Sequence, residues 1–188
     1  MEAHAPAGLP ARTARMVSFA TLGTLSTTQE LAGRALAAME GADPEQVAEE
    51  TLCLVATATA RAAGVGLRAA PDLAGAVLPA LLDLPFTYRD YLVGGAMIET
   101  QHAALQEAAE AVTGRLQRMR AFYEAHLPPN QFPGPTALSD KMALWMGRIS
   151  PPRLPESPTR RLERLDLVPV LVTHLRLILA FARREAGP

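Results

Sequence analysis

The feature that most constrains the fold is a long stripe of mostly apolar residues whose spacings alternate between three and four positions. Because an α-helix completes one turn about every 3.6 residues, such a stripe places its side chains on one helix face. The pattern predicts a single helix over 88–126, which at ~1.5 Å per residue is about 58 Å long. That length exceeds what a compact domain of 188 residues needs, so we expect part of the helix to contact a second subunit. The stripe consists of Tyr88, Tyr91, Gly95, Ile98, His102, Leu105, Ala109, Val112, Leu116, Met119, Tyr123 and His126.

The composition and the remaining patterns indicate an all-α fold. Apolar residues make up 49% of the chain and charged residues 20%, as in globular domains. Alanine and leucine, both strong helix formers, are abundant, and no segment shows the alternation typical of strands. We therefore predict a single-domain bundle of about six helices. Besides the long helix, the predicted helices cover about 27–39, 44–63, 71–82, 137–146 and 158–184.

Local signals set several helix ends. Thr27 and Glu30 have the spacing of a capping box, which predicts a helix start. Asp43 followed by Pro44 is a second start signal, because aspartate accepts from free amides and proline suits the first turn.

We expect residues 1–26 to form a flexible N-terminal leader and residues 27–188 to form one helical domain. The Pro-rich segments at 127–135 and 150–158 are linkers short enough to lie inside that domain rather than to divide two.

The C-terminal helix, predicted over 158–184, is apolar on two faces, one through Leu175 and the other through Ile178. A helix of this kind is usually central in a bundle or enclosed at a dimer interface. Proline inside a helix removes a hydrogen bond, so Pro169 should kink it. We therefore predict a buried, Pro-kinked C-terminal helix.

Charge is unevenly distributed along the chain. Residues 27–110 carry twelve acids and four arginines, whereas residues 141–188 carry one lysine, eight arginines and four acids. The two parts neutralise each other within one fold or across a dimer, or else the basic part binds an anion or an acidic partner. We favour neutralisation.

The chain has a single cysteine, Cys53, so an intramolecular disulfide and a cysteine-based zinc site are both excluded. No apolar run is long enough to predict a membrane span, because His174 and Arg176 interrupt the longest one. We expect a cytoplasmic protein, and the bias toward alanine and arginine is typical of a GC-rich bacterial genome.

Glu99 and His102 have the Glu-x-x-His spacing that helical di-iron proteins use. The set is incomplete for two metals, since the chain has one such motif and His174 lacks a matching acid. A mononuclear iron or zinc site from Glu99, His102 and His174 is the functional interpretation, and a buried neutral histidine is the structural one. Gly95, on the same stripe, fits close helix packing or room for a ligand. We favour packing and predict no cofactor.

Arg160, Arg161 and Arg164 lie at the start of the last predicted helix, where cations oppose the helix dipole. Together with the free amides of that helix start they are candidates for an anion site. The alternative is that they pair with neighbouring acids such as Glu156.

These patterns favour a non-catalytic helical protein that binds another protein, or a second copy of itself, through the long helix. No hydrolase, phosphate-loop or dinucleotide signature is found in the sequence. The alternative is a helical enzyme or sensor with a pocket around Glu99, His102 and His174 for a metal or a small apolar or anionic ligand. Nucleic acid is not expected, because basic stripes and stacking aromatics are lacking.

Overall fold

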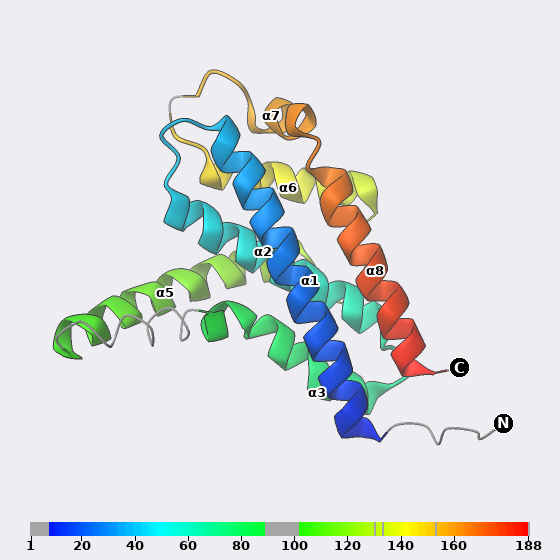
Figure 1. Cartoon of the computed structure of the whole chain (residues 1–188). Coiled ribbons are helices and arrows are strands. Elements are labelled where there is room, and N and C mark those ends of the chain that lie inside the picture. Colours follow the sequence, from blue (N-terminus) through cyan, green and yellow to red (C-terminus); the bar gives the residue numbers. More distant parts are fainter. Residues whose placement is uncertain (1–7, 89–101, 130, 133, 153, 188) are drawn as a thin grey trace.

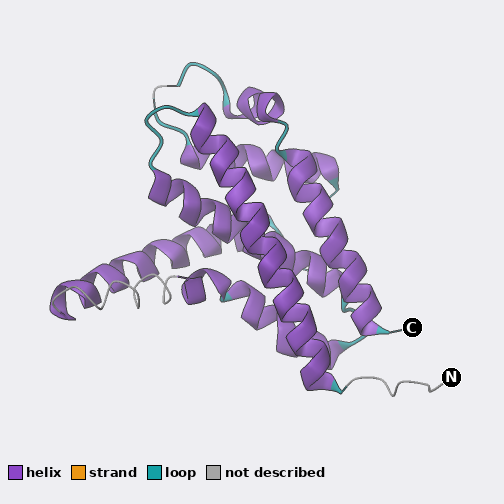
Figure 2. Ribbon diagram, in the orientation of Figure 1, coloured by secondary structure: helices purple, strands orange, loops and turns teal. Residues whose placement is uncertain are grey.

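The computed structural model describes residues 8–88, 102–129, 131–132, 134–152 and 154–187. All regular structure in these residues is helical, and no strand occurs among them, so the predicted all-α class is confirmed (Figures 1 and 2). The helices are α1 (Leu9–Ala38), α2 (Pro44–Gly66), α3 (Pro71–Leu82), α5 (His102–His126), α6 (Pro135–Ile149), α7 (Pro158–Leu165) and α8 (Val168–Ala186).

Helix α2 is the central element, because it contacts α1, α3, α5, α6 and α8. Every residue from Glu50 to Ala60 is buried. Many of these residues are alanine or threonine, whose small side chains let neighbouring helices approach from all sides. Asp43 starts the helix as predicted, since its Oδ1 atom accepts a hydrogen bond from the Glu45 amide at 3.0 Å.

The expected flexible leader over 1–26 is wrong from Leu9 onward, because α1 begins there and continues to Ala38. One face of its first half is buried through Met16, Ala20 and Thr24, so packing and not a cap signal determines the start. Thr27 of the expected capping box lies inside α1, where its side chain is also buried.

The C-terminal helix differs from the prediction in two ways. It is divided into α7 and α8, which are bent by 70° at the break rather than kinked at Pro169. Asp166 adopts a left-handed conformation with φ of 49°, and Pro169 lies in the first turn of α8. Helix α8 also buries one face, through residues such as His174 and Ile178, and exposes the other. The helix that is buried on all sides, over residues 50–60, is therefore α2.

Within the described residues, no single helix is long and apolar enough to cross a membrane, although α7 and α8 taken together reach that length and composition.

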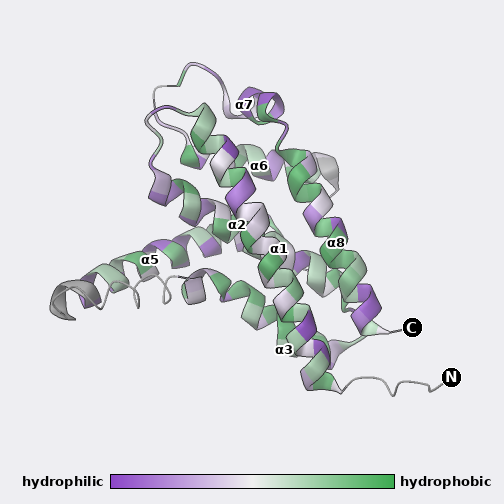
Figure 3. Cartoon of the chain, viewed as in Figure 1, coloured by the Kyte–Doolittle hydropathy of each residue, from purple (hydrophilic) through white to green (hydrophobic). Residues whose placement is uncertain are grey.

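The second half of the predicted long helix is α5, whereas residues 89–101 lie outside the described residues. Figure 3 shows hydrophilic and hydrophobic residues interleaved along α5, as the stripe predicts. Leu116, Met119 and Tyr123 are buried, and α5 packs against α2 of the same chain. This part of the stripe belongs to the core of the monomer, so it offers no surface for a second subunit.

Gly66 marks the closest approach of α2 and α8. A Cβ atom added there would lie 2.5 Å from Ala182 Cβ and 3.0 Å from the carbonyl oxygen of Leu179. Gly66→Ala is therefore expected to lower the free energy of unfolding by about 1–3 kcal/mol, the range for overpacked cores. Chemical denaturation measures this change.

The matched control is Gly33→Ala on α1, where an added Cβ atom meets no neighbouring atom within 4 Å. Alanine at such a helix-interior position is expected to raise stability by roughly 0.5–1 kcal/mol. Equal effects at the two glycines would contradict the close contact between α2 and α8.

Candidate functional site

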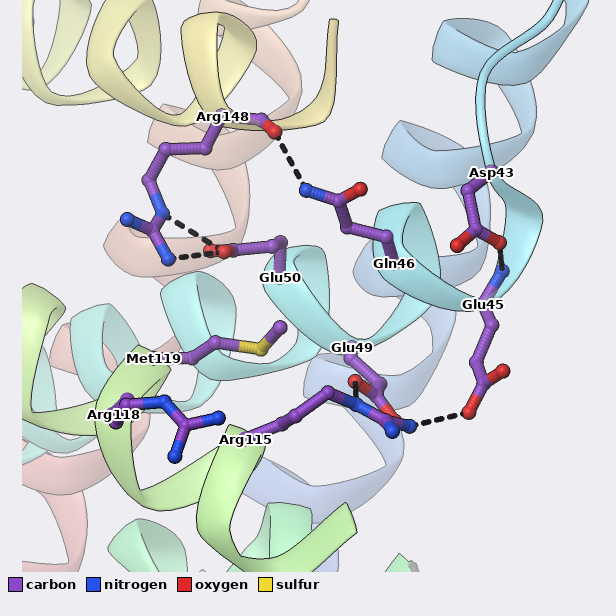
Figure 4. Close-up of a pocket in the computed structure, with 9 residues that line it drawn as sticks. All are labelled: Asp43, Glu45, Gln46, Glu49, Glu50, Arg115, Arg118, Met119 and Arg148. Carbon is purple, nitrogen blue, oxygen red and sulfur yellow. Dashed lines mark hydrogen bonds and ion pairs between the residues drawn. The ribbon is translucent and has the colours of Figure 1, made fainter. Parts of the chain in front are cut away.

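A hollow of about 360 Å³ opens between the first turns of α2, the middle of α5 and the end of α6 (Figure 4). We call it the charged hollow, because most of its lining side chains are ionisable. Those residues are Asp43, Glu45, Gln46, Glu49, Glu50, Arg115, Arg118, Met119 and Arg148.

Glu50 is the innermost group of the charged hollow, with 1% of its surface exposed. Its Oε1 atom accepts from Arg148 through Nε at 2.8 Å and through Nη2, and its Oε2 atom accepts from the Tyr123 hydroxyl at 2.6 Å. The Glu50 hydrogen bond raises the pKa of Arg148, and burial raises the pKa of Tyr123. The buried carboxylate is thus fully paired, as a buried charge must be.

Arg115 crosses the lower edge of the charged hollow and joins two acids of α2. Its Nε and Nη2 atoms donate to Glu49 at 3.1 and 2.9 Å, and Nη2 also donates to Glu45 at 2.5 Å. These hydrogen bonds, with that to Glu49 the largest cause, raise the pKa of Arg115. Arg118 lies beside it in Figure 4, and within the described part of the chain Arg118 has neither an ion pair nor a hydrogen bond.

The described lining of the charged hollow contains no serine, cysteine or histidine, so it offers no conventional nucleophile or imidazole base. Cys53, also on α2, is fully buried, and burial raises the pKa of its thiol. A raised thiol pKa disfavours the reactive thiolate. The ion pairs between these acids and arginines join α2 to α5 and α6. Their contribution is electrostatic, and it holds the three helices together.

His174 is buried beneath α1, where its Nε2 atom lies 2.8 Å from the Thr59 hydroxyl. Thr24 donates to the same hydroxyl oxygen at 3.1 Å. Burial lowers the pKa of His174 from 6.5 to about 4, so the ring is neutral at pH 7. Gly23 allows this position, since a Cβ atom there would lie 3.0 Å from His174 Cε1.

The proposed metal ligands are not brought together in the described part of the chain. Glu99 and Gly95 lie outside the described residues, and His102 is described only as the first residue of α5. In Figure 1 the beginning of α5 lies at the left end of the molecule and α8 at the right. No group of three metal-ligating side chains occurs in the described residues.

The three arginines of the expected anion site have different environments. Arg161 is buried, donates to the Ser150 hydroxyl and, at 2.7 Å, to the Glu156 carbonyl oxygen. Arg164 binds the Glu156 carboxylate at 3.0 Å, while the exposed Arg160 contributes its amide to the Ser157 cap. Two of the three arginines therefore pair with Glu156, and the alternative interpretation is the correct one for them.

Sequence reasoning missed a surface formed jointly by α1 and α8. The Phe19 and Phe181 rings stack with their centroids 4.1 Å apart. Leu22, one turn further along α1, is 70% exposed, and Leu177, one turn earlier on α8, is 57% exposed. Because the two helices run antiparallel (Figure 1), both leucines lie on the same side of the stacked phenylalanine pair along the helix axes. We call this surface the α1–α8 face.

Arginines border the α1–α8 face. Arg184 lies over the Phe181 ring at 4.5 Å, and Arg15 binds Glu185 at 2.7 Å. Residues 9–26 and 168–186 together hold five arginines and one acid, the buried Glu185. The lack of acids over 9–26 was the one sequence signal for this surface, and the expectation of a flexible leader obscured it.

No family model matches this sequence, and no curated protein or solved structure is similar to it.

Proposed function

We propose that the chain is a non-catalytic interaction protein that binds an acidic partner helix through the α1–α8 face. The main support is the pair of exposed leucines, Leu22 and Leu177, beside a stacked aromatic pair and within an arginine border. Aromatic residues and arginine are enriched at protein interfaces, whereas lysine and glutamate are depleted. The chain carries these residue types on one surface of two adjacent helices.

The chemistry of the face specifies the partner. An amphipathic helix laid across α1 and α8 would contact Leu22 and Leu177 with its apolar side. Its acidic residues would then lie near Arg15 and Arg184, and they would speed encounter and fix orientation. An apolar helix without acids would offer Arg184 no acidic partner.

The same charges disfavour a homodimer through this face. In a twofold dimer each patch meets its own copy, so two strongly basic surfaces would face each other. Like charges placed opposite one another weaken association. Of the two partners that the sequence suggested, a second copy or another protein, we therefore propose another protein.

The test uses a designed helical peptide with leucines on one face and glutamates on the other, titrated against the protein. Leu22→Glu or Leu177→Glu should weaken its binding by about tenfold or more, because loss of an interface anchor typically costs over 1 kcal/mol. Both side chains are largely exposed, so the fold should persist. Fluorescence anisotropy of the labelled peptide measures the dissociation constant.

Leu144→Glu is the matched control, since Leu144 is 41% exposed and belongs to α6 rather than to α1 or α8. It should leave peptide binding unchanged, and a peptide with lysine in place of glutamate should not bind. Equal weakening by Leu144→Glu, or equal binding of both peptides, would refute the proposal. Binding of anionic vesicles in place of the acidic peptide would also refute it, because it would identify a membrane as the partner.

A further inference from the structure

A second pocket, distinct from the α1–α8 face, lies where α2, the end of α5 and the start of α6 meet. It encloses about 240 Å³. Its ionisable lining residues are Arg61, His126 and Lys141, and no acid lines it among the described residues. We call it the basic pocket. The charged hollow, in contrast, is lined by four carboxylates and three arginines.

Arg61 is held in position without being neutralised. Its Nε atom donates to the Leu127 carbonyl oxygen at 2.8 Å, and the side chain is half-buried. In the described part of the chain its terminal Nη atoms have no hydrogen-bond partner. An arginine anchored by one edge can present its remaining N–H groups to a phosphate in a fixed geometry.

Lys141 and His126 complete the set of donors. Lys141 is the only lysine of the chain, and within the described residues it has no ion pair or hydrogen bond. His126 is the last residue of α5, and its Nδ1 atom lies 2.7 Å from the Phe122 carbonyl oxygen. Nδ1 therefore carries the hydrogen, and Nε2 is left to contact a ligand.

Unpaired cations that share one pocket repel each other, and a bound anion would remove this repulsion. The volume exceeds the needs of a bare phosphate, and Leu127, Pro128 and Ala137 supply apolar walls. We propose that the basic pocket binds the phosphate group of a small organic monophosphate, with its organic part against these walls. Arg61 would bind two phosphate oxygens, and Lys141 would act as a point charge.

The experiment is isothermal titration calorimetry of the full chain with phenyl phosphate and, separately, with inorganic phosphate. Phenyl phosphate should bind at one site and more tightly than inorganic phosphate. Lys141→Gln should weaken it by about tenfold or more, because one charge-assisted hydrogen bond contributes roughly 1.5–3 kcal/mol.

Arg160→Gln is the matched control, since it removes one exposed positive charge elsewhere, and the Arg160 side chain makes no ion pair or hydrogen bond within the described residues. It should leave the affinity for phenyl phosphate unchanged. Equal weakening by both variants, or no saturable binding by the wild type, would overturn the proposal. Equal affinity for both phosphates would overturn the assignment of an organic ligand.

A second measurement, by NMR, reports directly on ligand binding in the basic pocket. Because Lys141 is the only lysine, ¹⁵N-lysine labelling gives a single amide resonance that reports on this pocket. Phenyl phosphate should shift that resonance with the calorimetric dissociation constant. A resonance that stays unchanged at saturation would place the ligand elsewhere and overturn the assignment, even if Lys141→Gln proves unstable.

Discussion

Arg148→Ala is expected to lower the free energy of unfolding by about 3–5 kcal/mol, the cost of leaving a buried charge without its partner. Arg148 donates twice to Glu50, whose surface is 1% exposed. Among the described residues, the Tyr123 hydroxyl would remain as the sole hydrogen-bond donor to that carboxylate. Urea denaturation followed by the fluorescence of Trp145, the single and buried tryptophan, measures the change.

Two further variants separate the buried pair from general charge effects. Arg115→Ala removes an arginine that is 37% exposed and whose partners Glu45 and Glu49 are 67% and 14% exposed, so it should cost less than Arg148→Ala, about 1 kcal/mol. In a Glu50→Gln background Arg148→Ala should cost much less than in the wild type, because no buried charge is left unpaired. A cost for Arg148→Ala no larger than that of Arg115→Ala would contradict the structural role of Glu50.

His174 should make stability depend on pH between about 4 and 6.5. Burial lowers its pKa in the folded state from 6.5 to about 4. As pH falls through this window the unfolded chain binds a proton and the folded chain does not, so stability decreases. Above pH 6.5 this contribution is constant. The loss on reaching pH 4 is at most about 3 kcal/mol, from ~1.4 kcal/mol per pKa unit.

Urea denaturation at pH values from 4 to 8 measures this dependence. Carboxylates also titrate near the lower limit, so the wild type is compared with His174→Gln, which keeps a polar atom near the position of Nε2. The variant should lack the decrease between pH 6.5 and 5. An NMR titration in which the His174 ring protonates near pH 6.5 in the folded protein would contradict the prediction.

Local sequence signals predicted several elements well. Asp43 starts α2, and the proline starts of α2 and α3 match the structure. Predictions from local sequence patterns were wrong where tertiary contacts determine the bounds of a helix. Thr27 was predicted to cap a helix because Glu30 follows it three positions later, yet it is buried inside α1. The predicted number of helices, about six, joined α7 and α8, because the left-handed conformation of Asp166 has no glycine to indicate it.

The candidate sites were harder to predict than the helices. Burial of His174 was one of the two interpretations open from the sequence, and the structure supports it. The ion pairs of Glu49 and Glu50 were not predicted, because their partners Arg115 and Arg148 lie 66 and 98 positions away in the sequence. No local spacing can indicate such pairs. The α1–α8 face likewise exists only because residues 19 and 181 meet in space.

The most direct measurement of the proposed function is NMR chemical-shift mapping with leucine methyl groups labelled with ¹³C. The acidic helical peptide should shift the methyl resonances of Leu22 and Leu177 and leave those of Leu144 unchanged. The shifts should diminish as salt is added, because screening weakens contacts between exposed charges. Shifts centred on Leu144 instead, or none at saturating peptide, would contradict the assignment of the α1–α8 face as the binding surface.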